Sequence, residues 1–116
     1  MSYESQIYIV KPHREGLSMD FAEKVAMFRL GYVDGMYEFA RKYPESSCYI
    51  LDDGCDAEII FDKYGELLRE IPIRELIFEL DRRNRENKRW DISTAIAALA
   101  HYSDTPCKLV ALHYGY

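Results

Sequence analysis

The sequence has few residues of the kinds that cross-link or interrupt a fold: three cysteines, four prolines and six glycines among 116 residues. The cysteines (Cys48, Cys55 and Cys107) are odd in number and do not form C-x-x-C pairs. A disulfide scaffold is therefore not expected, and a reducing, cytoplasmic compartment fits better. No apolar run approaches the roughly 18 residues of a membrane span, and the first residues lack the features of a signal peptide.

Sequence motifs of catalysis and cofactor binding are also missing. The chain contains no G-x-S-x-G, G-x-x-x-x-G-K-[ST], G-x-G-x-x-G or H-E-x-x-H pattern. The acidic segment at residues 52–56 lacks the spacing of an EF-hand. We therefore expect no enzyme, no cofactor and no metal site. An enzyme or small-ligand site would have to bring His13, His101 or His113 together with carboxylates.

The remaining composition is that of one globular domain covering residues 1–116. Apolar residues make up 48 % and charged residues 30 % of the chain. A chain of this size can bury about two-thirds of its surface. The fold therefore needs no metal or disulfide for stability.

The first third of the chain predicts a strand and a long helix. Residues 5–11 are β-branched and aromatic, and Pro12 is expected to end this strand. From a cap at Ser18, apolar residues recur every three or four positions up to residue 43, which predicts a helix. Gly31 and Gly35 interrupt the pattern, and whether they break the helix stays open. The apolar positions of this predicted helix are Phe21, Val25, Phe28, Tyr32, Met36, Phe39 and Tyr43.

The rest of the chain predicts three strands, two helices and a closing strand. Residues 47–51, 57–62 and 66–71 alternate around turn signals and predict an antiparallel meander. Pro72 suits the start of a second helix, and a third helix follows to residue 105. Residues 108–114 predict the last strand. The order is β-α-β-β-β-α-α-β, which indicates an α+β fold: a mostly antiparallel sheet with helices packed on one face, in a two-layer sandwich.

Charge is distributed unevenly along the chain, whose net charge is −5. Residues 45–62 contain six acids and no lysine or arginine, whereas residues 82–89 contain five bases and one acid. A general affinity for nucleic acid is not expected of an acidic chain. Clustered acids repel one another and favour a compensating partner. Whether the basic run neutralises the acidic stretch within the molecule stays open.

Tyrosine is abundant, with ten residues, and two of these border the acidic stretch. Tyrosine is enriched at protein interfaces because it adds contact area with a polar tip at low entropic cost. We therefore expect a partner-binding surface there. Its candidate residues are Asp52, Asp53, Asp56, Glu58, Asp62, Tyr49 and Tyr64.

These features favour a protein-binding module, and most concretely a stoichiometric inhibitor that covers the basic cleft of a nucleic-acid-processing enzyme or toxin. In being short, acidic and without motifs, the chain resembles toxin-immunity proteins and phage anti-defence proteins such as anti-CRISPRs. The alternatives are a homo-oligomeric structural or small-ligand-binding domain, with a homodimer among the options, and a nucleic-acid-binding accessory protein. The candidate nucleic-acid-binding residues are Arg82, Arg83, Arg85, Lys88 and Arg89.

Overall fold

The computed structural model describes residues 4–15, 18–46, 49–52, 55–59, 61–85, 88–105 and 108–115. Side chains are described for 4–12, 22–46, 61–85, 88–105 and 108–115. The elements in chain order are β1 (Ser5–Glu15), β2 (Ser18–Gly31), α1 (Met36–Ala40), β3 (Glu45–Ser46), β4 (Tyr49–Asp52), β5 (Cys55–Ile59), β6 (Leu68–Ile71), α2 (Ile73–Asn84), α3 (Trp90–Ser103) and β7 (Val110–Gly115). None of the described helices is long and apolar enough to cross a membrane.

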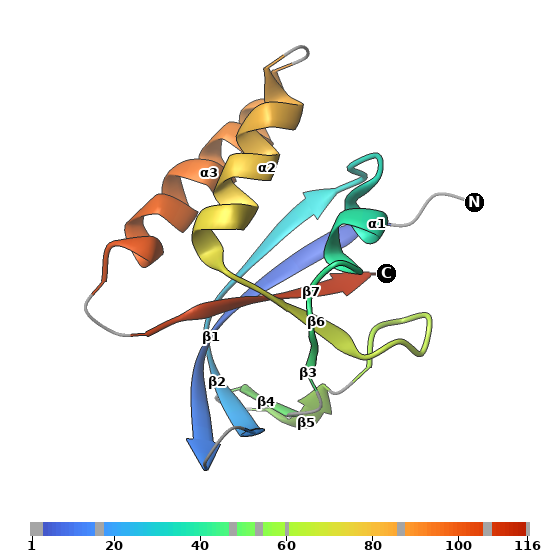
Figure 1. Cartoon of the computed structure of the whole chain (residues 1–116), viewed down its shortest axis with the longest axis vertical. Helices are drawn as coiled ribbons and strands as arrows, with labels where there is room; N and C mark the ends of the chain where they lie inside the picture. The colour runs from blue at the N-terminus through green and yellow to red at the C-terminus, as the bar shows by residue number, and fades with distance from the viewer. Residues whose placement is uncertain are drawn as a thin grey trace.

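The α+β fold class is confirmed. The described strands form a seven-stranded sheet in the order β3-β6-β7-β1-β2-β4-β5. Its pairings are antiparallel except that between β2 and β4. Helices α2 and α3 lie side by side at one end of the molecule, and the β4–β5 hairpin lies at the opposite end (Figure 1). This arrangement separates the basic end of α2 from the acidic hairpin.

The predicted long helix over residues 18–43 is wrong. Its first half is strand β2, which pairs with β1 along its length, and only the five residues of α1 are helical. Gly31 and Gly35 have φ angles of 65° and 73°, which L-residues with side chains rarely adopt. The first glycine ends β2 and the second precedes α1, so these glycines form the corner between the two elements.

Strand β1 continues to Glu15 and is not stopped by Pro12 as predicted. The neighbouring strand β7 ends its pairing with β1 at Val10, whereas Pro12 pairs only with β2 among the described strands. A proline lacks the backbone N–H, and beyond Val10 no described strand pairs with β1 on the side of β7, where a missing donor leaves no acceptor unpaired. The proline is therefore compatible with the strand.

The predicted meander is correct for its first two strands, whereas the third strand forms but does not pair with β5 among the described strands. The β4–β5 hairpin forms, with its turn residues outside the described part of the chain. Strand β6, however, pairs with β3 and β7 at the other side of the sheet. One isolated bridge, between Phe61 and Leu67, closes the short loop before β6.

Both faces of the central strand β1 are buried. Ile7 and Ile9 point into the main core, which lies between the sheet and the helices. Tyr8 and Val10 point to the opposite face, where they pack in a second, smaller cluster with Leu112. Alternate side chains of a strand point to opposite faces, so a strand buried on both sides is apolar throughout.

Helices α2 and α3 form where the sequence predicts them. The predicted apolar positions Ile73, Leu76 and Leu80 of α2 are buried in the main core. Helix α2 ends at Asn84, so only part of the polar run after residue 80 continues it. The segment that follows places Arg89 against the corner between β2 and α1.

Candidate protein-binding surface

The acidic hairpin β4–β5 carries most of the predicted partner-binding residues. Tyr49 and Asp52 are the first and last residues of β4, and Asp56 and Glu58 lie in β5. Their side chains lie outside the described part of the structure, as does the whole of Asp53. The backbone therefore places these residues together on one hairpin at the edge of the sheet.

The carboxylate of Asp62 holds the turn at residues 61–66. Its Oδ1 accepts hydrogen bonds from the backbone N–H groups of Tyr64 and Glu66, at 2.8 Å and 3.0 Å. Its Oδ2 accepts one from the hydroxyl of Tyr37, at 2.6 Å. Asp62 is only 9 % exposed. It therefore fixes the conformation of the turn and adds little exposed negative charge to the surface.

Tyr37 of α1 contacts this turn through Asp62 and Tyr64. Burial and the hydrogen bond to Asp62 raise the pKa of its phenol, so the hydroxyl stays protonated and donates. The guanidinium of Arg41 lies 5.0 Å from the centre of the Tyr37 ring and pairs with Glu66 at 2.7 Å. The ring of Tyr64 meets the ring of Tyr37 edge-on at 6.4 Å.

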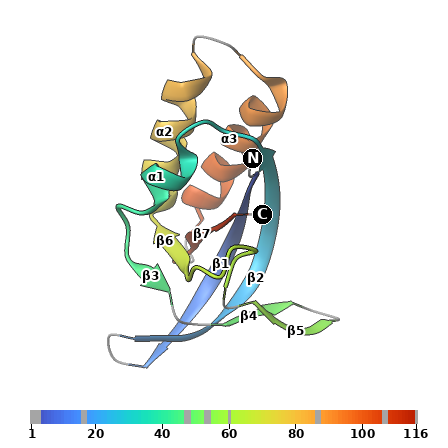
Figure 2. The same cartoon turned by 90° about the vertical axis from the view of Figure 1, so that its right-hand side faces the viewer.

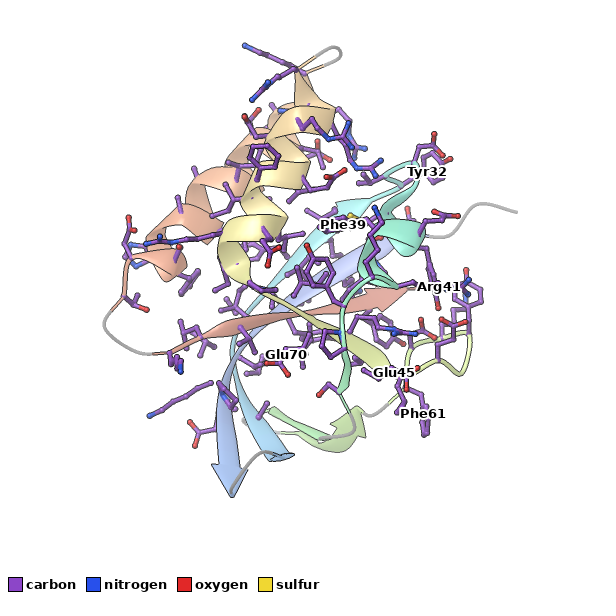
Figure 3. The ribbon with its side chains drawn as sticks, viewed as in Figure 1. Tyr32, Phe39, Arg41, Glu45, Phe61 and Glu70 are labelled. Atoms are coloured by element: carbon purple, nitrogen blue, oxygen red, sulfur yellow. The ribbon has the colours of Figure 1, made fainter. Side chains whose placement is uncertain are left out.

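Two aromatic side chains of the turn face solvent. Phe61 is 54 % exposed and Tyr64 is 41 % exposed. Figure 3 shows Phe61 close to the end of β5 and to Glu45, on the side of the molecule where Arg41 also lies. In the sequence Phe61 alternates with Ala57 and Ile59 on one face of a predicted strand, a pattern that does not reveal its exposure.

A buried serine–histidine pair lies behind the same region. Ser5 Oγ and His113 Nε2 are 2.9 Å apart, and the two residues are 1 % and 3 % exposed. Burial lowers the pKa of His113 to about 4, against a smaller opposing effect of Asp62. The pair is enclosed in the fold, and the ring of His113 packs edge-on against Tyr37.

The two histidines whose side chains are described do not lie together in one site. His113 is buried beside Tyr37, whereas His101 is exposed near the end of α3, where it packs against Tyr102. The side chain of His13 lies outside the described residues. Within the described side chains, no group of three His, Cys, Asp or Glu residues is placed to hold a metal ion.

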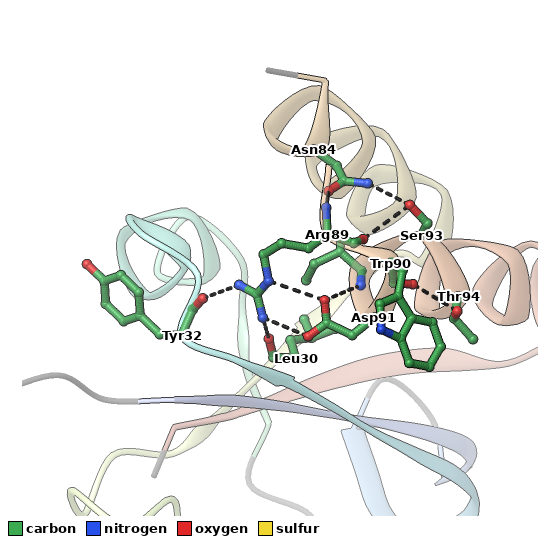
Figure 4. A network of polar contacts seen from close by, with 9 residues as sticks. Leu30, Tyr32, Asn84, Arg89, Trp90, Asp91, Ser93 and Thr94 are labelled. Atoms are coloured by element: carbon green, nitrogen blue, oxygen red, sulfur yellow. Dashed lines mark hydrogen bonds and ion pairs between the residues drawn. The ribbon is translucent and has the colours of Figure 1, made fainter. Parts of the chain in front are cut away.

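The basic run is held by contacts at the opposite end of the molecule. Arg89 donates to the carbonyl oxygens of Leu30 and Tyr32, at 2.9 Å and 2.6 Å, and pairs with Asp91 (Figure 4). These carbonyl and carboxylate acceptors engage all three nitrogens of the guanidinium.

The other arginines of this run are also engaged. Arg83 pairs with Glu79 and donates to the carbonyl oxygens of Asp34 and Gly35. Two further ion pairs join Arg82 to Glu79 and Arg85 to Asp81. Lys88 is exposed. The ion pairs of these arginines with described side chains all join acids of their own end of the molecule, whereas the side chains of the acidic hairpin lie outside the described residues.

A cavity of about 470 Å³ lies between the basic run and the corner that follows β2. Arg82, Arg83 and Arg89 line it together with Tyr32 and Asn84. The guanidinium groups that line it are those already bound to carbonyl oxygens and carboxylates. This cavity is therefore less cationic than the sequence suggests.

Comparison with protein-family models, with curated proteins and with solved structures finds no match to this chain.

Proposed function

We propose that this chain is a protein-binding module that acts in the cytoplasm as a stoichiometric inhibitor of a nucleic-acid-processing enzyme or toxin. The observation that carries the proposal is the turn at residues 61–66. This turn exposes Phe61 and Tyr64 on a conformation that Asp62 fixes, directly after the acidic hairpin β4–β5. Such a surface is suited to a partner with a basic substrate-binding cleft.

Two physical effects favour binding through this surface. Aromatic side chains that are already ordered lose little conformational entropy on binding and dominate the energy of many interfaces. The acidic strands increase the rate at which a cationic partner arrives, an effect that salt weakens. The turn supplies the contact area, and the hairpin supplies the electrostatic attraction.

Binding of nucleic acid by residues 82–89 has less support. Arg83 and Arg89 direct most of their donors to backbone carbonyls and carboxylates. A phosphate would have to compete with these intramolecular contacts. Nucleic-acid binding that falls steeply with salt, and that substitution of Lys88 abolishes, would instead favour a nucleic-acid-binding role for residues 82–89.

The proposal is tested by capture followed by reconstitution. The tagged protein is incubated with lysate from its source, and the captured protein is identified and purified. We expect one nucleic-acid-processing protein, whose activity falls to zero at one equivalent of this chain. Capture of no such protein, or activity that is unchanged at a large excess of this chain, would contradict the proposal.

Charge reversal then locates the binding surface. Substitution of Asp52→Lys and Asp56→Lys together is expected to slow association with the captured partner by at least about tenfold at low salt. A matched control reverses Glu4 and Asp104, which are exposed and outside this hairpin, and changes the net charge equally. Equal slowing by the two double variants would show that only net charge matters, and would argue against the hairpin.

A further inference from the structure

The outer edge of β2 has a stretch without a neighbouring strand. Strand β2 pairs with β1 along its length, with register shifts that leave Val25 and Leu30 without a directly opposite residue, but it pairs with β4 only at residues 21–23. Among the described strands, none lies beside residues 24–30 on that side. Figure 2 shows this part of β2 along the margin of the molecule. The backbone N–H and C=O groups of such an edge can pair with another strand.

Both limits of this stretch are set by contacts of the fold. At one end β4 occupies the edge next to Glu23. At the other end Arg89 donates to the carbonyl oxygen of Leu30. The middle of residues 24–30 is Met27, which is 38 % exposed, and Val25 beside it is 45 % exposed. A strand that pairs with this edge would therefore be centred on Met27.

The charges at the two ends of the edge are of opposite sign. The acidic hairpin begins beside the start of β2 through the β2–β4 pairing. At the other end lie Arg29 and Lys88, which are exposed and whose side chains make no ion pair in the described part of the chain. Two such edges in antiparallel orientation bring each acidic end against the cationic end of the other copy.

We propose that a second copy of this chain pairs with residues 24–30 of β2 in antiparallel orientation, with the two Met27 residues opposite each other at the twofold axis. In this register Val25, which is the extra residue at the register shift between β1 and β2, lies near Arg29 of the second copy, and the apolar stem of the arginine covers the valine. The acidic hairpin of each copy approaches Arg29 of the other. An interface of seven residues per copy is small, so the dimer is weak and forms at high protein concentration.

The register is tested by cross-linking. Residues directly opposite each other in an antiparallel pair have Cα atoms about 4.5–5.5 Å apart, within reach of a disulfide. The two Val25 residues would be about 14 Å apart in the proposed register. Under mild oxidation with oxidised glutathione we expect Met27→Cys to give a covalent dimer and Val25→Cys to stay at the background of the native cysteines. Equal cross-linking of both variants would overturn the register.

The dimer itself is tested by sedimentation of the native chain over a range of concentrations. Met27→Lys places like charges at the axis and is expected to raise the dissociation constant by at least about tenfold. Phe78→Lys, on an exposed side chain of α2, is the matched control and is expected to leave it unchanged. A chain that stays monomeric at the highest soluble concentration would overturn the proposal, as would a dimer that Met27→Lys does not weaken.

Discussion

The guanidinium of Arg89 donates from Nη2 to the carbonyl oxygen of Leu30 across 2.9 Å. The two residues are 59 positions apart in the sequence. The contact fixes the segment before α3 to the end of β2, and a second donor to Tyr32 extends it around the corner. A Cβ added to Gly31 would lie 3.3 Å from the same guanidinium, so the glycine leaves room for it. Arg89 thus joins the helical layer to the sheet.

Substitution of Arg89 by methionine is expected to lower the free energy of unfolding by about 2 kcal/mol. The change keeps an apolar stem but removes the donors to two carbonyl oxygens and to Asp91, and hydrogen bonds to charged groups are stronger than neutral ones. Arg85→Met is the control, because Arg85 is 66 % exposed and its pair with Asp81 is 3.3 Å long. Exposed ion pairs contribute little to stability, so we expect Arg85→Met to change the free energy of unfolding by no more than about 0.5 kcal/mol. Chemical denaturation measures both, and equal losses would contradict a special role for Arg89.

The sequence reveals the helices α2 and α3 because the apolar positions of each helix recur with the helical period within one short segment. It does not reveal β2. The spacing from Phe21 to Tyr43 fits a helix, but the same residues also alternate: Ala26 and Phe28 pack on the main core, whereas Val25 and Met27 face solvent. Pairing with β1 decides between the two patterns, and that contact is not local.

The candidate site is predictable only in part for the same reason. The sequence places the acids and tyrosines near one another, and the hairpin β4–β5 brings four of them together. It does not show that Asp62 turns inward, because the donor from Tyr37 comes from 25 residues away. Nor does it show that the acids Glu79, Asp81 and Asp91 pair with the basic run, since charge runs alone do not define partners.

Removal of the Asp62 carboxylate is expected to destabilise the fold and loosen the turn at residues 61–66. Asp62→Ala removes the acceptor of the N–H groups of Tyr64 and Glu66 and one acceptor of the Tyr37 hydroxyl, which costs about 3 kcal/mol. Asp62→Asn keeps one acceptor oxygen and is expected to lose less. Denaturation measures the stability, and hydrogen exchange at Tyr64 and Glu66 reports on the turn. Slow exchange at both amides in Asp62→Ala would contradict the role given to this carboxylate.

Stability is expected to depend on pH through His113. In the unfolded chain this histidine takes up a proton near its ordinary pKa of 6.5, whereas burial lowers the pKa to about 4 in the folded protein. Between these values the unfolded state binds more protons. The contribution of His113 to the free energy of unfolding is therefore complete above the pKa of the unfolded state and is lost as the pH falls toward the pKa of the folded state. The expected loss is about 2 kcal/mol between about pH 7 and about pH 5.

The matched variant His113→Gln removes this titration. Its free energy of unfolding is expected to be lower at neutral pH but to change less over the same interval, because glutamine does not bind a proton in either state. Denaturation curves at a series of pH values measure both slopes. A native protein whose stability follows that of the variant at every pH would show that His113 is not the group responsible.

Substitution of the exposed aromatics at residues 61–66 is expected to weaken binding to the protein partner and leave the fold intact. Phe61→Ala and Tyr64→Ala each remove an exposed side chain that is outside the buried core, so the free energy of unfolding should change by less than about 1 kcal/mol. An aromatic residue at the centre of an interface contributes about 2 kcal/mol or more to binding, so each variant should raise the dissociation constant by about thirtyfold.

Phe78→Ala removes a side chain of equal size that is 65 % exposed on α2, at the other end of the molecule. Calorimetric titration of the three variants against the captured partner compares them directly. If Phe78→Ala weakens binding as much as Phe61→Ala does, the partner does not bind through the turn held by Asp62.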